Sequence, residues 1–136
     1  MMIVPLISGL KWNVLTSRLN ALKITSLATF SPEKYCRVPL ENTKGLIRLL
    51  CFGPGQNVAL HSHPKSDEWF LVIEGKGKIT IDREELDADS GCIFQAPAGI
   101  AHRWQNGGDK LIVLSILTPT SAYELADEAV QQKFLQ

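Results

Sequence analysis

Apolar residues along most of this chain fall in short runs separated by turn-forming residues. From residue 35 onward, β-branched, aromatic and leucine side chains gather in segments bounded by Gly, Pro, Asn and Asp. Strands that recur at intervals of about 8–12 residues with turns between them are typical of an all-β sandwich or barrel. The predicted strands cover residues 35–38, 46–52, 57–63, 68–74, 76–82, 92–95, 101–105 and 111–117.

The two ends of the chain differ from this strand-rich centre. Residues 1–24 carry three basic side chains and no acidic one, and their apolar residues recur at helical intervals. An arm that packs on the barrel or on a partner subunit, an upstream extension and a targeting peptide are alternative interpretations of this segment. Near the C-terminus the pattern becomes helical, with Ser121 and Glu124 at capping-box spacing. We therefore expect an arm (1–24), a β-domain (25–120) and a C-terminal helix (121–136).

The composition limits the possible partners. A length of 136 residues suits a single domain, and 14 basic residues balance 14 acidic ones, so no basic surface for a nucleic acid is expected. No apolar run reaches the roughly 18 residues that a membrane-spanning helix needs. We expect neither a nucleic acid nor a membrane as a partner.

The cysteines are odd in number and widely spaced. Cys36, Cys51 and Cys92 form no C-x-x-C pair. A thiolate ligand or nucleophile is one interpretation, but a small apolar filler in a strand is the favoured one. A chain without a disulfide framework fits a reducing, cytoplasmic setting.

The only three histidines of the chain fall in two glycine-punctuated segments. His61 and His63 are one residue apart, so on a strand both imidazoles lie on one face. Glu68 opens the next apolar strand, and a returning hairpin brings its carboxylate near this pair. His102 follows the rigid turn at residues 97–99. Each residue alone has an ordinary structural interpretation, but together three imidazoles and a carboxylate suit Mn, Fe, Co, Ni, Cu or Zn.

The spacing of these residues resembles the two sequence motifs of the cupin superfamily. The first motif is filled completely by Gly55-x5-His61-x-His63-x4-Glu68-x6-Gly75. The second is filled completely by Gly91-x5-Pro97-x-Gly99-x2-His102-x3-Asn106. Fifteen residues separate Gly75 from Gly91, which is similar to the short spacing of compact, microbial, single-domain members (type-2 monocupins).

The resemblance implies a fold, a metal and an assembly. The fold is an antiparallel double-stranded β-helix, or jelly-roll barrel, here with a short C-terminal helix. The metal is a divalent transition ion such as Fe, Mn, Ni or Zn, held in the mouth of the barrel by His61, His63, Glu68 and His102. The expected assembly is a homodimer. We also expect Gly75 and Gly91 to adopt positive φ at tight turns.

A pocket beside the metal follows from strand alternation. Residues two and four after Glu68, and two after His102, point inward with these ligands. Plain core packing is an equally good interpretation of the same residues, and Arg48 is a possible polar neighbour. Depending on the register of its strand, either Cys51 or Phe52 faces inward. The predicted lining is Phe70, Val72, Phe94, Trp104 and Cys51.

Two functions follow from these expectations. The first is a metalloenzyme of the oxygenase, lyase or isomerase type, because four protein ligands leave a six-coordinate ion about two open positions. The apolar lining favours a small, weakly polar organic substrate. The second is a non-catalytic module that binds a small ligand through the metal, because no general acid or base is evident beyond the ligands.

Overall fold

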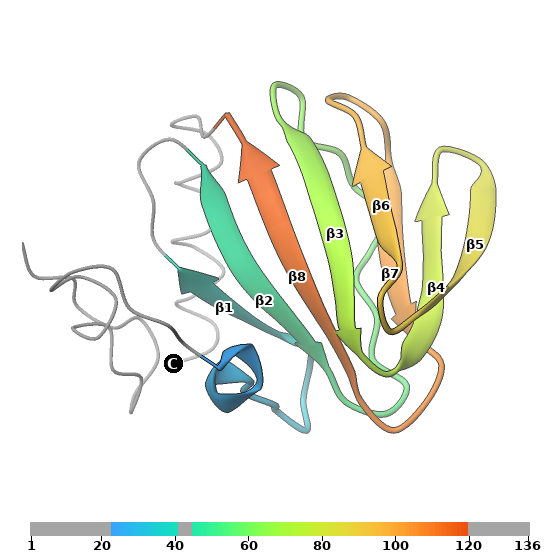
Figure 1. Cartoon of the computed structure of the whole chain (residues 1–136). Helices are drawn as coiled ribbons and strands as arrows, with labels where there is room; N and C mark the ends of the chain where they lie inside the picture. The colour runs from blue at the N-terminus through green and yellow to red at the C-terminus, as the bar shows by residue number, and fades with distance from the viewer. Residues whose placement is uncertain (1–22, 41–44, 120–136) are drawn as a thin grey trace, which may run out of the picture.

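Antiparallel strands make up most of the described chain (Figure 1). The computed structural model describes residues 23–40 and 45–119, and it confirms the expected all-β class. The predicted C-terminal helix and most of the predicted arm lie outside the described residues. The elements are η1 (Ile24–Leu27, a 3-10 helix), β1 (Cys36–Leu40), β2 (Leu46–Phe52), β3 (Asp67–Glu74), β4 (Lys76–Ile81), β5 (Glu84–Asp89), β6 (Ile93–Ala96), β7 (His102–Asn106) and β8 (Leu111–Thr118).

The strands form two sheets with the main core between them. The five-stranded sheet has the order β1-β2-β8-β3-β6, and the three-stranded sheet, at the right of Figure 1, has the order β5-β4-β7. Both sheets supply apolar side chains to one buried cluster, as alternation along each strand requires. This cluster contains Leu50, Phe52, Phe70, Val72, Ile79, Ala88, Ala96, Trp104, Leu111 and Val113.

A second apolar cluster covers part of the outer face of the five-stranded sheet. It contains Cys36, Val38, Leu49, Cys51 and Ile112, and side chains of η1 pack against it. Strand β2 is therefore buried on both faces. This explains why its sequence is a nearly continuous apolar run rather than an alternating one.

The structure corrects two of the predicted elements. Residues 57–63 form no strand and are tied to the three-stranded sheet only by isolated bridges at Asn57 and His61. Strand β5 was not predicted, because four of its six residues are acidic and acidic residues are poor strand formers. Its alternation is nevertheless preserved, with Leu86 and Ala88 toward the core and the carboxylates toward solvent.

Gly75 makes the tight turn between β3 and β4 possible. It adopts φ +96°, as predicted for this position, and a Cβ atom here would collide with the backbone carbonyl of Lys110. Gly91, before β6, likewise adopts a positive φ of +92°. Within the described residues no helix is long and apolar enough to cross a membrane.

Candidate metal centre

The three imidazoles are brought together by the backbone around β7. His102 begins β7, and His61 lies beside it in an isolated antiparallel bridge. His61 N donates to the His102 carbonyl at 3.0 Å, and His102 N donates back at 2.8 Å. The two rings lie 4.6 Å apart between centroids. His63 follows two residues later, where its carbonyl accepts a hydrogen bond from Gly99 N at 2.9 Å.

The carboxylate of Glu68 completes the cluster from the second position of β3. All four side chains offer a ligand atom within 4.8 Å of one another. Glu68 Oε1 lies 2.9 Å from His102 Nε2 and 3.1 Å from His63 Nε2. Two ligand atoms that each lie about 2.1 Å from one ion, at a right angle, are about 3.0 Å apart. The donor set and its spacing therefore fit a transition-metal ion.

Hydrogen bonds at Nδ1 of His61 and His102 indicate which ring nitrogen carries the proton. His61 Nδ1 lies 2.7 Å from the Ala59 carbonyl oxygen, and His102 Nδ1 lies 3.0 Å from that of Ile100. Because a carbonyl only accepts, a neutral ring carries its proton on Nδ1 and keeps a lone pair on Nε2. His102 Nε2 faces Glu68 Oε1 at 2.9 Å. In the metal-free protein a shared proton joins these two atoms in a hydrogen bond, and a bound metal ion takes the place of that proton.

The second oxygen of Glu68 is held by side chains of β2 and β8, which lie on one side of β3 in the sheet. Arg48 Nη2 donates to Glu68 Oε2 at 2.9 Å, and Ser115 Oγ donates to the same oxygen. Burial acts to raise the pKa of this carboxyl, but the hydrogen bonds from His102 and His63 and the charge of Arg48 outweigh it. The pKa of Glu68 is therefore held well below its usual range. Glu68 is ionised, with Oε1 directed at the imidazoles.

The protonation state of His61 also suits metal binding. Burial is the largest influence on this ring, and it lowers the pKa of His61 to about 4 although the hydrogen bond to Ala59 opposes the shift. At neutral pH the ring is uncharged. This is the form of imidazole that binds metals, so no proton has to be displaced at this position.

A small cavity of about 20 Å³ lies beside the cluster, with room for one or two water molecules. Two of the predicted lining residues, Phe70 and Trp104, line this cavity. The Phe70 ring lies 5.6 Å from that of His102 and 5.5 Å from that of Trp104. The other side chains around it, besides His61, Glu68 and His102, are Tyr35, Arg37, Arg48, Leu50 and Val58.

The remaining predicted pocket residues lie elsewhere. Val72 and Phe94 belong to the core between the sheets, and neither lines the cavity. The register of β2 decides between Cys51 and Phe52. Phe52 faces the interior, whereas Cys51 lies in the outer cluster, where burial raises the pKa of its thiol to about 11. Cys51 is therefore an apolar filler at this position, away from the cavity.

The family model of the cupin domain matches residues 48–117, slightly more than half of the chain. The chain belongs to the cupin family. The match includes the four residues of the cluster and confirms the resemblance seen in the two motifs.

Several curated proteins resemble this cupin over part of their length. The polyketide synthase CurC of Streptomyces cyaneus is 36% identical over 70 residues, which are 50% of this chain and 44% of that protein. The tetracenomycin polyketide synthase protein TcmJ of Streptomyces glaucescens is 30% identical over 67 residues, 49% of this chain and 45% of the relative. The chain thus spans about half the length of the curated relatives it matches.

Solved structures match the fold more completely. The protein TT1209 from Thermus thermophilus superposes with a TM-score of 0.72 and 27% identity, over 74% of this chain and 98% of that one. A protein with a double-stranded β-helix domain from Klebsiella pneumoniae has a TM-score of 0.71 at 23% identity, over 77% and 94% of the two chains. The second likeness shows the fold alone.

Sequence reasoning missed several polar neighbours of this cupin site. Arg48 was expected only conditionally, and Tyr35, Arg37 and Ser115 were not expected at all. Arg48 and Ser115 each interrupt an otherwise apolar strand, which is a detectable signal of a buried polar role. Tyr35 and Arg37 carry no such signal, because they lie just before and at the second position of β1, a strand whose register is visible only in the structure.

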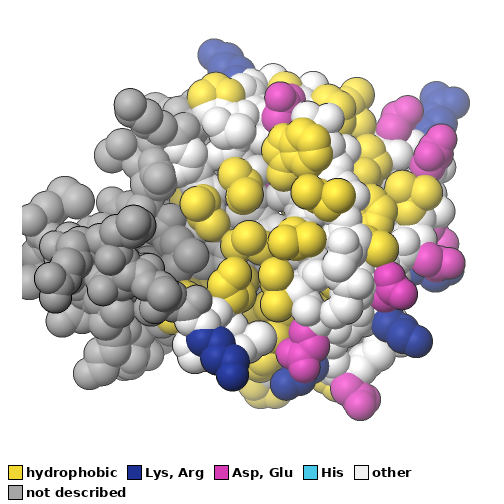
Figure 2. All heavy atoms as spheres, viewed as in Figure 1, with side chains coloured by type: hydrophobic (Ala, Val, Ile, Leu, Met, Phe, Trp, Pro, Cys, Tyr) yellow, Lys and Arg dark blue, Asp and Glu magenta, His cyan; other side chains and the backbone are white. Residues whose placement is uncertain are grey.

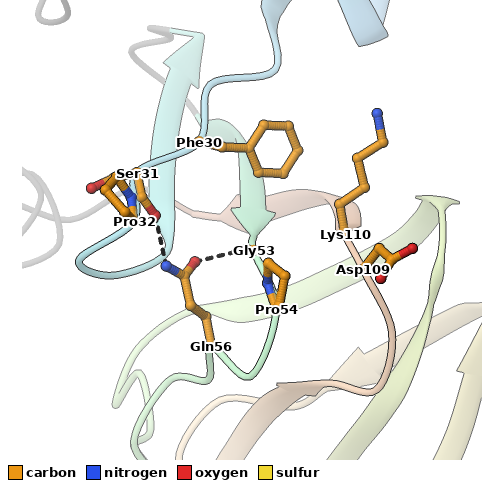
Figure 3. Close-up of a pocket in the computed structure, with 8 residues that line it drawn as sticks. All are labelled: Phe30, Ser31, Pro32, Gly53, Pro54, Gln56, Asp109 and Lys110. Carbon is orange, nitrogen blue, oxygen red and sulfur yellow. Dashed lines mark hydrogen bonds between the residues drawn. The ribbon is translucent and has the colours of Figure 1, made fainter.

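A larger hollow, of about 470 Å³, lies at the opposite end of the strands (Figure 3). Its walls follow the end of β2 and precede the start of β8, whereas the cluster lies near the start of β3 and of β7. Gln56 is fixed there by hydrogen bonds from Gly53 N and to the Ser31 carbonyl, both 2.7 Å long. None of the four cluster residues lines this hollow.

Proposed function

We propose that this cupin is a metal-dependent enzyme of the oxygenase, lyase or isomerase type that acts on a small organic molecule. The observation that carries the proposal is the cluster of three imidazoles and one ionised carboxylate beside a small cavity. A divalent transition ion such as Fe, Mn, Ni or Zn, when bound by these residues, supplies Lewis-acid or redox chemistry.

The chain's own residues prepare the site for that chemistry. The carbonyls of Ala59 and Ile100 orient the rings of His61 and His102 so that their Nε2 atoms face the cluster. Glu68 contributes one oxygen while its other oxygen is held by neighbouring strands. Phe70 and Trp104 form an apolar wall that limits the access of water.

The relatives support a ligand with oxygen functions. Two of them are named as polyketide synthase proteins, and polyketides are carbon skeletons rich in carbonyl and hydroxyl groups. The arginines and the tyrosine around the cavity agree with such a ligand. Together with these polar side chains, the weakly polar ligand expected from the sequence becomes a molecule with an apolar body and a polar end.

A non-catalytic module that binds a small ligand through the metal is the second candidate. The lining of the cavity favours this binding module in one respect. Among the described residues, Glu68 is the one carboxylate that lines the cavity, and because it belongs to the cluster it is not available as a general acid or base. Such a protein would hold the metal and the ligand without turning the ligand over.

Metal analysis and a substrate screen test the proposal. We expect untagged protein, purified without added metal, to hold about one transition-metal ion per chain, and His102→Ala to lose at least about tenfold in metal affinity. Glu85→Gln, a change on the exposed side of β5, is the control and keeps the metal. Mass spectrometry of metabolite mixtures then identifies any compound consumed by the wild type and not by His102→Ala. A folded protein without bound metal contradicts both candidates, and bound metal without turnover favours the binding module.

We also propose that two copies pair through the outer face of the five-stranded sheet. Figure 2 shows hydrophobic side chains gathered over this face, beyond the part that η1 covers. Trp69, Ile93 and Ile116 are 40%, 62% and 36% exposed there, and they alternate with side chains that point to the core. The outward positions between them, Leu71, Gln95 and Leu114, carry no charge. An uncharged apolar face is complementary to a second copy of itself.

The thiols support a reducing, cytoplasmic setting as part of the proposal. Cys36 and Cys51 are direct partners in the register of β1 and β2, yet both are free thiols. Burial raises the pKa of each thiol, which keeps both in the unreactive protonated form.

A further inference from the structure

The ring of His102 is held at both of its nitrogen atoms. Its Nε2 faces Glu68 Oε1 at 2.9 Å, and its Nδ1 lies 3.0 Å from the carbonyl oxygen of Ile100. His102 is only 2% exposed, so water has little access to either contact. The orientation of the ring therefore depends on where Glu68 lies and on where the backbone just before His102 lies.

That backbone is a tight turn at residues 97–99, which lies between β6 and β7 and belongs to neither strand. Gly99 adopts a positive φ of +82°, and Ile100 N donates to the Pro97 carbonyl at 3.0 Å. Because no strand pairing fixes the turn, the position of the Ile100 carbonyl depends on the other contacts that anchor it.

Two hydrogen bonds anchor the turn to the segment that leads into β3. Asp67 Oδ1 accepts a hydrogen bond from Ala98 N at 2.8 Å, and the His63 carbonyl accepts one from Gly99 N at 2.9 Å. The second bond joins backbone atoms only, whereas the first depends on a side chain. Asp67 is the first residue of β3 and the neighbour of Glu68 in the sequence, yet it is 31 residues away from Ala98.

The Asp67 carboxylate acts through this turn rather than inside the cluster. Asp67 and Glu68 are consecutive on β3, so their side chains point to opposite faces of the sheet. Among the described residues, the hydrogen bond from Ala98 N is the one polar contact of the Asp67 side chain. A backbone N–H that donates to a carboxylate makes a stronger bond than one between neutral groups.

We propose that Asp67 is a positioning residue, which holds the turn at residues 97–99 so that His102 meets Glu68 in the cluster. The inference rests on the proposed function, because His102 is one of the residues that hold the metal there. Glu68 and His102 are 34 residues apart in the sequence. Asp67 links their two segments directly, so that Glu68 and the Ile100 carbonyl are both placed relative to the start of β3.

Asp67→Ala and Asp67→Asn separate the hydrogen bond from the charge of the side chain. Both variants remove the charge, but the Asn amide keeps an oxygen that accepts from Ala98 N. The affinity for cobalt(II) is measured by competition with a chelator. We expect Asp67→Ala to bind cobalt(II) about tenfold more weakly than the wild type, and Asp67→Asn to stay within about threefold of it.

Ser90→Ala is the matched control. It removes another exposed hydrogen bond from a side chain to the backbone, which runs from Ser90 Oγ to the Ile73 carbonyl at 2.9 Å. Ile73 lies near the end of β3, whereas Glu68 lies near its start. We therefore expect Ser90→Ala to leave the affinity for cobalt(II) unchanged.

Proton exchange in the metal-free protein, followed by NMR, tests the same assignment without a metal. In Asp67→Ala we expect the amide proton of Ala98 and the Nδ1 proton of His102 to exchange with water at least about tenfold faster than in the wild type. In Asp67→Asn we expect both rates to stay close to those of the wild type. Amide protons of β2 and β8 report whether the rest of the fold is unchanged.

The outcomes separate this inference from the proposed function. Equal affinity for cobalt(II) in the wild type and Asp67→Ala overturns the role of Asp67 while the metal site stands. A loss in Asp67→Asn as large as that in Asp67→Ala also overturns it, because the charge and not the hydrogen bond is then responsible. A wild type that takes up no metal overturns the proposed function. Proton exchange then decides the inference, which is overturned if the rate at His102 Nδ1 is the same in the wild type and Asp67→Ala.

Discussion

His61 shows how burial sets the chemistry of a single residue in this cupin. Burial and the neighbouring imidazoles favour the neutral form of its ring, although the hydrogen bond that Nδ1 donates to the Ala59 carbonyl opposes this effect. Glu68, a few residues away, is more deeply buried and is kept in its charged form by the donors around it. Two neighbouring titratable groups are thus held in the two states that a metal site needs.

These pKa shifts predict a pH dependence for the metal-free protein. The pKa of His61 is about 4 in the folded chain and about 6.5 when unfolded, so the unfolded state binds more protons between these values. The free energy of unfolding therefore falls as the pH falls from about 6.5 to about 4, and the lowered pKa of Glu68 continues the loss at lower pH.

Urea unfolding at pH about 7.5 and about 5 measures this dependence. We expect a smaller difference between the two pH values in His61→Gln, which has no ring to protonate. The same difference in wild type and His61→Gln contradicts the assignment.

At the scale of elements, three adjacent strands share one polar array inside an apolar sheet. Arg48 on β2 and Ser115 on β8 are direct register partners, and Glu68 on β3 is reached by both side chains. Arg48 and Glu68 have only 5% and 2% of their side-chain surface exposed. Breaking such a buried pair leaves one charge uncompensated, which is far more costly than losing an exposed pair.

Arg48→Met is therefore expected to lower the free energy of unfolding of the metal-free protein by about 3–5 kcal/mol. Adding Glu68→Gln to the same chain is expected to recover part of the loss, because a neutral amide needs no counter-charge. Lys78→Met is the matched control: its pair with Glu85 spans 3.2 Å and is about half exposed, so we expect a cost below about 1 kcal/mol. Denaturant unfolding measures all three, and equal costs for Arg48→Met and Lys78→Met would contradict the argument.

At the scale of the whole molecule, the proposed pairing through the outer face of the five-stranded sheet leads to a prediction about the assembly. Ile93 lies on the edge strand β6 and is 62% exposed on the apolar face. A carboxylate there would have to be desolvated in an interface between two copies.

We expect the wild type to have the mass of a dimer by light scattering and Ile93→Glu to have the mass of a monomer. Leu60→Glu, at a residue that is 55% exposed outside the strands, should remain a dimer. A wild-type monomer would rule out pairing through this face.

The pattern of residues along the chain predicted much of the fold and named all four residues that the structure brings together in the cluster. Alternating apolar positions indicated the strands, and two histidines one residue apart pointed to a shared face. Strand β5 was not predicted, because its acidic residues are poor strand formers. Its strand character is evident only from its pairing with β4. The segment at residues 57–63 was expected to be a strand because its composition is strand-like, but it pairs only at isolated bridges.

Local pattern by itself determined what depends on neighbours in sequence: the turns at Gly75 and Gly91, the all-β class, and the residue types of the cluster. The tertiary structure alone decided what depends on register between strands. Pairing of β1 with β2 placed Arg37 inside and Cys51 outside, because a shift of one residue exchanges the two faces. The cavity beside the four cluster residues has polar side chains in its lining for that reason, and these come from residues far apart in the chain.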